Sequence, residues 1–377
     1  MKTDLSKQLL KNIIEPIVND EDEAEKIFSD LQFLGEYKYD QYELYAPGRH
    51  FLEHFYVWIK QFDKEDRKIA LDLINNHLIF ISRSEFELLT RVLYWETVRR
   101  IQFDMVSKET GIERYRVNKI LKSNEFKMIE RSSLYIGMSD GARIDYFRRQ
   151  NKAISNEQVL TSYHVDQLKC DDMITKLEAE CGNGSRFRIL FLIDDFCASG
   201  STLIQMGQNQ KVSGTLSQLE AKTFPQIKKV DGKDILTSPS LLDVLLSEDC
   251  EIYLCPLLAT SKSVEHITSN IHLLSSKLKN LIVTPVSILN ENSSINPDEH
   301  PIGSLCKKYY QRRMGDEHTG NVMYGYKSCA LILGLHHNTP NNSVYLLWNR
   351  LASESDGDNP PFEPLFKRIE RHRSSVN

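Results

Sequence analysis

Apolar residues in the first hundred positions recur every three or four residues, which is the period of an amphipathic helix. Two segments with this period are DRKIALDLINNHLIFIS and SEFELLTRVLYWETVRRI. Near the start of the second segment, Ser82 and Ser84 are each followed three residues later by Glu, so either serine could cap this helix. A third segment, FLEHFYVWIKQF, carries an aromatic stripe made of Phe51, Phe55, Trp58, Ile59 and Phe62. We therefore predict an all-α N-terminal region with this stripe in its core.

The pattern changes near residue 133, where short apolar runs begin to alternate with segments of helical period. The runs are SLYIGMS, RILFLIDD, EIYLCPLLA, LIVTPVSIL and SCALILGLHHN. They are apolar at both odd and even positions, as in strands that are buried on both faces. Alternation of such strands with helices is typical of a parallel sheet. We predict an α/β fold with a mainly parallel sheet flanked by helices, preceded by an all-α domain.

A length of 377 residues fits two or three domains. The change of pattern places a helical domain at residues 1–130 and the α/β domain at residues 131–377. A long stretch of mixed character at about residues 206–247 separates two of the predicted core strands. We expect this stretch to be an insertion.

The stretch FDMVSKETGIERYRVNKILKSNEF fits a helix-turn-helix at residues 103–123. Val106 would lie on the first helix, and Gly111 would form the turn because glycine adopts a positive φ at low cost. Three apolar residues would pack inward and four basic residues would lie on the second helix: Ile112, Val117 and Ile120, and Arg114, Arg116, Lys119 and Lys122. A plain helical hairpin gives the same pattern, so contact with DNA is one of two interpretations.

Composition and charge limit the choice of partner and location. The formal net charge of -5 gives no overall basic field that would attract nucleic acid or an anionic membrane, although it does not exclude a local basic face. The seven cysteines include no CxxC pair, which argues against a zinc site. Because the N-terminal residues lack the apolar run of a signal peptide, we expect reduced thiols and a cytoplasmic protein. The longest apolar runs are too short to cross a bilayer, so we expect no membrane partner.

Two acids and a loop of small residues follow a buried strand in the stretch RILFLIDDFCASGSTLIQ. Ligands of open α/β sheets bind beyond the carboxyl ends of the strands. We expect the strand to end at Asp194 and Asp195 and a helix to begin near Thr202. The loop between them, with the N-terminus of that helix, would bind a phosphate through Ala198, Ser199, Gly200, Ser201 and Thr202. Since carboxylates repel phosphate, the acids would bind sugar hydroxyls or a divalent metal ion. A phosphate loop beside such acids indicates a phosphorylated ribose as the ligand.

This stretch resembles the phosphoribosyl-diphosphate (PRPP) signature of type I phosphoribosyltransferases. The signature is an apolar strand, two acids, three residues, Thr or Ser, Gly, one residue, and Thr or Ser, and it is matched at Asp194, Asp195, Ser199, Gly200 and Thr202. The resemblance implies that the acids hold the ribose 2′- and 3′-hydroxyls and Mg²⁺, and that residues 198–202 wrap the 5′-phosphate. Walker B strands and phosphate-accepting aspartates are the competing interpretations, but the chain has no GxxxxGK[ST] loop. A capped strand–helix turn without a ligand is the structural alternative.

The same resemblance assigns a role to the earlier stretch SLYIGMSDGARIDYFRRQN. Type I phosphoribosyltransferases hold the pyrophosphate with a loop that follows an early strand. The matching loop here would contain Ser139, Asp140, Gly141, Ala142 and Arg143, with Gly141 allowing close approach and Arg143 neutralising a diphosphate. Arg148 and Arg149 fit this site or a solvated helix face equally well.

A third group of polar residues follows the run SCALILGL, in the sequence HHNTPNN. Polar residues at the carboxyl end of a strand point into the crevice of the sheet. Adjacent histidines on a strand face opposite sides, so His336 and His337 would not bind one metal ion. We assign His337, Asn338 and Asn341 as candidate substrate contacts, while the asparagines fit an Asx turn as well.

Taken together, the three motifs and the helical N-terminal region resemble the phosphoribosyltransferase-like proteins of bacterial conflict systems, some of which are toxin effectors of retron-type antiphage operons. This resemblance implies a protein or ribonucleoprotein partner such as a reverse transcriptase complex. The chain lacks the flexible catalytic loop and the base-specific hood of metabolic phosphoribosyltransferases. The alternative is a PRPP-sensing regulator that binds DNA through residues 103–123 and catalyses nothing.

Overall fold

The computed structural model describes residues 2–207, 211–224, 226–230, 233–274, 276–310, 320–349 and 362–368. Contacts within the chain divide it into two compact units. The first unit combines Met1–Phe86 with Glu291–Asn377, and the second is Glu87–Asn290. The boundaries between these units do not coincide with the domain boundary predicted at residue 130, because the last part of the chain packs with the first. As functional domains, the ranges 1–130 and 131–377 stay predictions.

The first unit is mainly helical. Its helices are α1 (Lys2–Val18), α2 (Glu21–Tyr37), α3 (Phe51–Lys60), α4 (Arg67–Asp72), α14 (Pro301–Tyr309) and α15 (Tyr345–Trp348). The aromatic stripe of α3 is buried, as predicted, and the Trp58 indole N–H donates to the Leu346 carbonyl at 2.8 Å. The helix predicted across residues 79–81 is wrong. These residues form strand β1 (Ile79–Ile81), which pairs in parallel with β12 (Leu333–Leu335).

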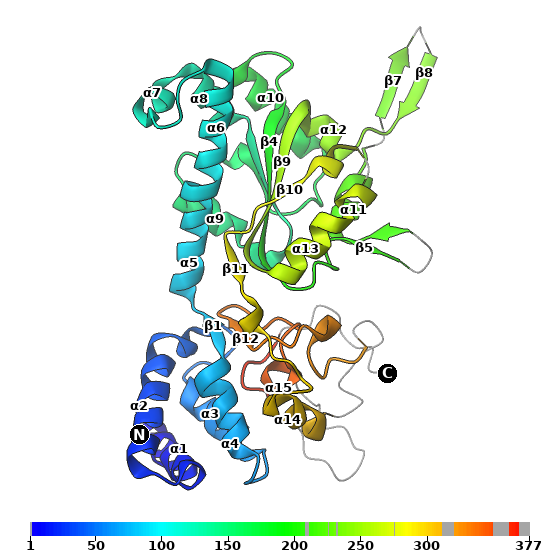
Figure 1. Cartoon of the computed structure of the whole chain (residues 1–377). Helices are drawn as coiled ribbons and strands as arrows, with labels where there is room; N and C mark the ends of the chain where they lie inside the picture. The colour runs from blue at the N-terminus through cyan, green and yellow to red at the C-terminus, as the bar shows by residue number, and fades with distance from the viewer. Residues whose placement is uncertain are drawn as a thin grey trace. The chain divides into compact units, whose positions relative to one another are not determined.

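The second unit contains a six-stranded sheet whose recorded pairs are all parallel. Its strands are β2 (Ser133–Gly137), β3 (Val159–Leu160), β4 (Phe187–Cys197), β9 (Leu246–Thr260), β10 (Ile282–Val283) and β11 (Ser287–Leu289). They lie in the order β10-β9-β4-β2-β3, with β11 also pairing with β9. Figure 1 labels β4, β9, β10 and β11 of this sheet. After β2 the chain forms β3 on one side of that strand, and then β4 and β9 on the other side. The strand order therefore reverses between β2 and β4. The predicted α/β fold is confirmed.

Both faces of this sheet are buried. On one face, apolar residues of β2, β4 and β9 form a cluster with helices α10 (Gln167–Cys181), α11 (Thr215–Ala221), α12 (Leu241–Leu245) and α13 (Ser261–Asn270). On the other face, Tyr135, Phe191 and Tyr253 lie opposite one another on neighbouring strands and their rings stack at 5.3 and 5.7 Å. Phe147 of α9 (Ile144–Gln150) packs on Tyr135 at 5.5 Å. Burial of both faces explains why the strands are apolar at every position.

The residues between β4 and β9 add two antiparallel hairpins and two helices. The first hairpin is β5 (Gln205–Met206) with β6 (Val212–Ser213), and the second is β7 (Gln226–Val230) with β8 (Lys233–Thr237). In the part of the chain that the structure describes, neither hairpin joins the six-stranded sheet. Figure 1 shows the hairpins projecting from one side of the second unit.

A long helical stretch precedes β2. It consists of α5 (Arg83–Val92), a π-helical segment (Leu93–Val98) and α6 (Arg99–Thr110). Gly111, with φ 69°, ends α6 and leads to α7 (Val117–Lys122) and α8 (Asn124–Arg131). Ser82 and Glu85 form the reciprocal cap predicted for α5. Across the described residues, no helix is long and apolar enough to cross a membrane.

The helix-turn-helix prediction is only partly matched by these helices. Val106 and Ile120 are buried as expected, but Val117 is 41% exposed, so its predicted inward packing is wrong. Arg114 and Arg116 lie before α7 rather than on it, and Arg114 forms an ion pair with Asp104 at 3.0 Å. Helix α7 has only six residues, because the chain turns again at Ser123, whose side chain caps α8. Contact with DNA through residues 103–123 stays a prediction.

Candidate functional site

The loops that follow β2 and β4 meet at the point where the strand order reverses. The two strands are neighbours, with Gly137 opposite Ile193, and the Met138 N–H donates to the Ile193 carbonyl at 2.8 Å. Parallel strands end at the same edge of a sheet, and this reversal point is where open α/β sheets bind ligands. The sheet therefore brings together two of the three sequence motifs.

Ser139 bridges the two acids of β4. Its hydroxyl lies 2.5 Å from Asp194 Oδ1 and 3.2 Å from Asp195 Oδ1. Asp194 Oδ1 also accepts the Asp195 backbone N–H at 3.1 Å. Ser139 thus occupies the position that a donor hydroxyl must take to be held by both carboxylates.

Gly141 is placed against the second acid by the 3-10 turn Asp140–Ala142. A Cβ atom added at Gly141 would lie only 2.1 Å from Asp195 Oδ2. Any side chain here would displace the carboxylate, so the predicted close approach of this glycine exists and its partner is Asp195. Both oxygens of Asp195 therefore face the loop that follows β2.

Burial raises the pKa of Asp194 well above its usual range, and the neighbouring Asp195 carboxylate raises it further. The hydrogen bond from Ser139 acts in the opposite direction, because it stabilises the charged form. Two carboxylates held side by side in a buried position favour a shared proton or a cation between them. This electrostatic demand fits a site that receives a metal ion or hydroxyl donors.

The path of the chain after the acids differs from the prediction. Strand β4 continues to Cys197, and no helix begins near Thr202. The Ile204 N–H donates to the Gly200 carbonyl at 3.1 Å, but this single turn does not propagate because the Thr215 N–H returns to the Thr202 carbonyl at 3.0 Å and closes the β5–β6 hairpin. A phosphate on this loop would therefore be held without the dipole of a following helix.

The loop from Ala198 to Thr202 is mostly buried, with only Thr202 exposed. The Ser199 and Ser201 hydroxyls lie 2.8 Å apart and bond to each other. Gly200 has φ +73°, and a Cβ atom there would lie 2.9 Å from His266 Cδ2. The loop needs glycine for both reasons, as the signature requires.

The sequence analysis missed two residues of this site, Thr260 at the end of β9 and Ser263 in the first turn of α13. The Thr260 hydroxyl donates to the Ala198 carbonyl at 2.5 Å and also caps α13. The Ser263 hydroxyl donates to the Cys197 carbonyl at 2.9 Å. The signal was present, because the sequence ATSKS after a buried run is an N-cap pattern at a strand end.

The remaining residues of the first loop are spread around the turn. Ala142 is buried, Asp140 is exposed, and Arg143 adopts a left-handed conformation with φ 46° at the start of α9. Arg149 is exposed and forms an ion pair with Asp145 at 3.4 Å on the same helix. This pair agrees with a solvated helix face for Arg149.

The third motif lies on the other sheet. His336 and His337 form the turn after β12, and the Asn338 N–H donates to the Leu335 carbonyl at 3.0 Å. Both histidine rings pack against Phe86, at 5.1 and 5.2 Å. Strand β12 pairs with β1 and is not a strand of the six-stranded sheet, so His337, Asn338 and Asn341 follow a strand of a different sheet from the acids. Their role as substrate contacts stays a prediction.

The donors at the site fit a magnesium ion that is bound together with a substrate. Mg²⁺ is usually held by one or two carboxylates plus substrate phosphates rather than by a complete protein cage. Asp194 and Asp195 supply such a pair. Within the described ranges no three His, Cys, Asp or Glu side chains gather where they could hold a metal ion.

A parallel sheet of this order, with one loop after β2 and a loop of small residues after the acids of β4, is the arrangement of a phosphoribosyltransferase-type domain. The chain belongs to the PRTase-CE family, whose model matches residues 56–368. The match includes the acids, both loops and the third motif. No curated protein and no solved structure matches the chain.

Proposed function

We propose that this protein binds PRPP, or a nucleotide that shares its ribose 5-phosphate, with Mg²⁺ at the edge of the six-stranded sheet, and that it acts at C1′. The observation that carries the proposal is the Ser139 hydroxyl between Asp194 and Asp195, at 2.5 and 3.2 Å. Two carboxylates that share one hydroxyl are suited to hold the two hydroxyls of a ribose. The loop from Ala198 to Thr202 starts three residues after Asp195, where the 5′-phosphate of the same sugar would lie.

In the proposed reaction the bond between C1′ and the diphosphate oxygen breaks, and pyrophosphate leaves with the electron pair. The incoming nucleophile is water, a base or a macromolecular group, and it loses one proton to the solvent. Asp194 and Asp195 would hold the sugar ring in place, and the backbone of residues 139–142 would stabilise the leaving group. Bound Mg²⁺ would supply positive charge to the diphosphate.

Depletion of a nucleotide precursor would arrest growth, which suits a toxin effector of a bacterial antiphage system, as the resemblance to conflict proteins implies. We extend this proposal to a retron-type system with a reverse transcriptase complex as partner. No cysteine of the described residues is recorded in a disulfide, and we propose a cytoplasmic location.

Calorimetry with PRPP, with and without Mg²⁺, tests binding, and release of pyrophosphate tests the chemistry. We expect the variant Asp194→Asn/Asp195→Asn to lose about a thousandfold in kcat/KM, in the range seen for removal of groups that stabilise a transition state. The matched control is Asp171→Asn/Asp172→Asn, two adjacent exposed acids on α10. Turnover that is unchanged in the first variant would rule out this site.

Toxicity in cells provides a second, separate test. Expression of the wild-type chain with its genomic neighbours should arrest growth when the system is triggered, and the Asp194→Asn/Asp195→Asn variant should not. If growth arrest persists in this variant while PRPP turnover is lost, the effector role does not depend on the PRPP chemistry, and the two parts of the proposal separate.

A further inference from the structure

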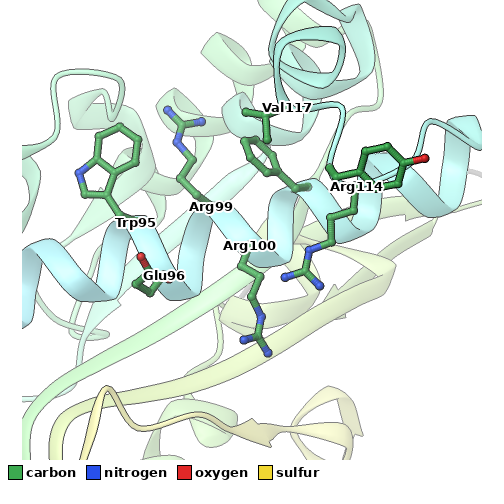
Figure 2. A pocket seen from close by; sticks show the side chains of 8 residues that line it. Trp95, Glu96, Arg99, Arg100, Arg114 and Val117 are labelled. Atoms are coloured by element: carbon green, nitrogen blue, oxygen red, sulfur yellow. The ribbon is translucent and has the colours of Figure 1, made fainter.

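An open pocket of about 410 Å³ lies on the second unit, where the π-helical segment, α6 and the turn before α7 meet. Three aromatic residues and three arginines make up most of its lining, and none of them belongs to the site at the sheet edge. Figure 2 shows Trp95, Arg99 and Arg100 along one helix, with Arg114 and Val117 toward one end of that helix.

Two aromatic rings of the pocket are open to solvent. Trp95 is 62% exposed and Tyr115 is 77% exposed, while Phe103 is half-buried and packs against Phe126 at 5.4 Å. Large flat rings at the rim of a pocket offer faces on which another ring can stack. The pocket therefore presents a surface for a planar ligand.

Trp95 is held from beneath by Arg99. The Arg99 guanidinium lies 5.9 Å from the Trp95 ring and 4.9 Å from the Tyr94 ring, and its charge is paired with Glu130 at 2.6 Å. Arg99 is nearly buried, so it acts as a support for the ring rather than as a contact for a ligand. A ring supported in this way loses little freedom when a ligand stacks on it.

The other two arginines offer positive charge. Arg100 is exposed and has no ion-pair partner among the residues that the structure describes. Arg114 is half-exposed, with its ion pair to Asp104, and Figure 2 shows both guanidinium groups extending to the same side of the helix. The segment from Glu87 to Arg131 carries ten Lys and Arg against seven Asp and Glu, in a chain whose net charge is -5. The segment that contains the pocket is therefore basic in an acidic chain, although Glu96 also lines the pocket.

We propose that this pocket binds a strand of single-stranded nucleic acid. A base would stack on Trp95 or Tyr115, and the phosphates on either side would meet Arg100 and Arg114. Exposed aromatic rings in a basic groove are the means by which proteins bind single strands, because every base has a flat face and every nucleotide a phosphate. A duplex hides those faces, so this mode differs from a recognition helix in the major groove. The proposal is independent of the ribose phosphate site.

Fluorescence anisotropy with a labelled oligothymidylate, at several salt concentrations, tests the proposal on the full chain. We expect Trp95→Ala and Tyr115→Ala each to weaken binding about tenfold, as for other stacked bases. Trp95→Phe keeps a ring and should retain most of the affinity. Arg100→Ala should lower the slope of log affinity against log salt by about 0.7, the contribution of one phosphate contact on a single strand.

Two controls match the exposure of the tested residues. Tyr37→Ala removes an exposed tyrosine from α2, and Arg149→Ala removes an exposed arginine from α9, and neither should change binding. The proposal is overturned if the wild-type chain does not bind the single strand, if it prefers the duplex, or if Trp95→Ala binds like Tyr37→Ala. It is also overturned if Trp95→Ala leaves strand binding intact and instead dissociates a dimer in light scattering, because the occupant is then a second copy of the chain.

Discussion

Two strands of this protein end in polar residues, and the two ends are built differently. Strand β4 carries Asp194 and Asp195 near its carboxyl end, and it lies between β2 and β9 in a six-stranded sheet. Strand β12 ends at Leu335 and is followed by His336 and His337, and its only recorded partner strand in the described part of the chain is the three-residue strand β1. In sequence the two ends look alike, since each is an apolar run followed by charged or amide residues.

The difference lies in what the neighbouring strand contributes. Beside β4, the loop after β2 brings Ser139 and Gly141 against the two acids, and the end of β9 adds Thr260. Beside β12, the histidines turn back within three residues and pack on Phe86. A polar strand end becomes a strong candidate site when adjacent parallel strands supply further loops at the same edge.

Among single substitutions, the largest effect that separates the two ends should come from Gly141→Ala. The added Cβ would lie 2.1 Å from Asp195 Oδ2 and force the carboxylate away. We expect PRPP turnover to fall about a hundredfold, since a shift of about 1 Å in a reacting group costs this much. Gly35→Ala is the control, because its Cβ would lie 3.3 Å from Phe51 Cδ1. Full turnover in Gly141→Ala would show that Asp195 does not position the substrate.

Removal of the bridging hydroxyl should have a smaller effect. We expect Ser139→Ala to lower kcat about tenfold, the usual order for a single hydrogen bond. Because the Ser139 bond lowers the pKa of Asp194, its loss should raise that pKa, and the acidic limb of the pH–rate profile should move to higher pH. A fall in kcat without a shift of the limb would mean that Ser139 acts only through packing.

The free energy of unfolding should depend on pH because Asp194 and Asp195 lie side by side. A carboxyl whose pKa is raised in the folded state contributes stability that is fully present below its unfolded pKa and is lost as the pH rises through the folded value. Asp194 therefore destabilises the protein at neutral and alkaline pH, and we expect Asp194→Asn to stabilise it there by about 1 kcal/mol. Melting temperatures across the pH range measure this difference. If Asp194→Asn stabilised the protein equally at acidic and at neutral pH, the stabilisation would not come from removal of a charge.

The smallest effect is expected at the other strand end. As a substrate contact, His337 would hold a base rather than the reacting sugar, so His337→Ala should raise KM about threefold and leave kcat unchanged. A loss of kcat comparable with that of Gly141→Ala would remove the distinction between the two strand ends. Steady-state kinetics with varied PRPP and acceptor concentrations decide between these outcomes.

The acids, the two loops and the parallel sheet could be predicted from the sequence, because each depends on local chemistry. Gly141 and Gly200 are required by close approach, and the apolar parity of β4 reflects burial on both faces. The hairpin after Gly200 could not be predicted, because it depends on Thr215 returning to Thr202. The pattern at residues 202–205 fits a helix until that long-range contact is known.

The position of the third motif could not be predicted for a similar reason. The residues of β12 have the composition of any buried strand, and only the pairing of Ile79 with Leu333 assigns them to the first unit. The helical period around residues 67–83 concealed β1, since three residues are too few to show alternation. The local sequence of β1 or of β12 alone does not indicate that the two strands pair.

The interrupted first unit has a consequence for the synthesis of the protein. The hydrogen bond between Trp58 and Leu346 joins residues that are 288 positions apart in the sequence. The core around α3 therefore cannot be completed until Leu346 has been translated. At typical elongation rates this interval lasts roughly 15–60 seconds. During that time the aromatic stripe of α3 is a target for chaperones, while the residues of the six-stranded sheet have already left the ribosome. All residues of the second unit, which carries the candidate site, are therefore synthesised before the core of the first unit can be completed.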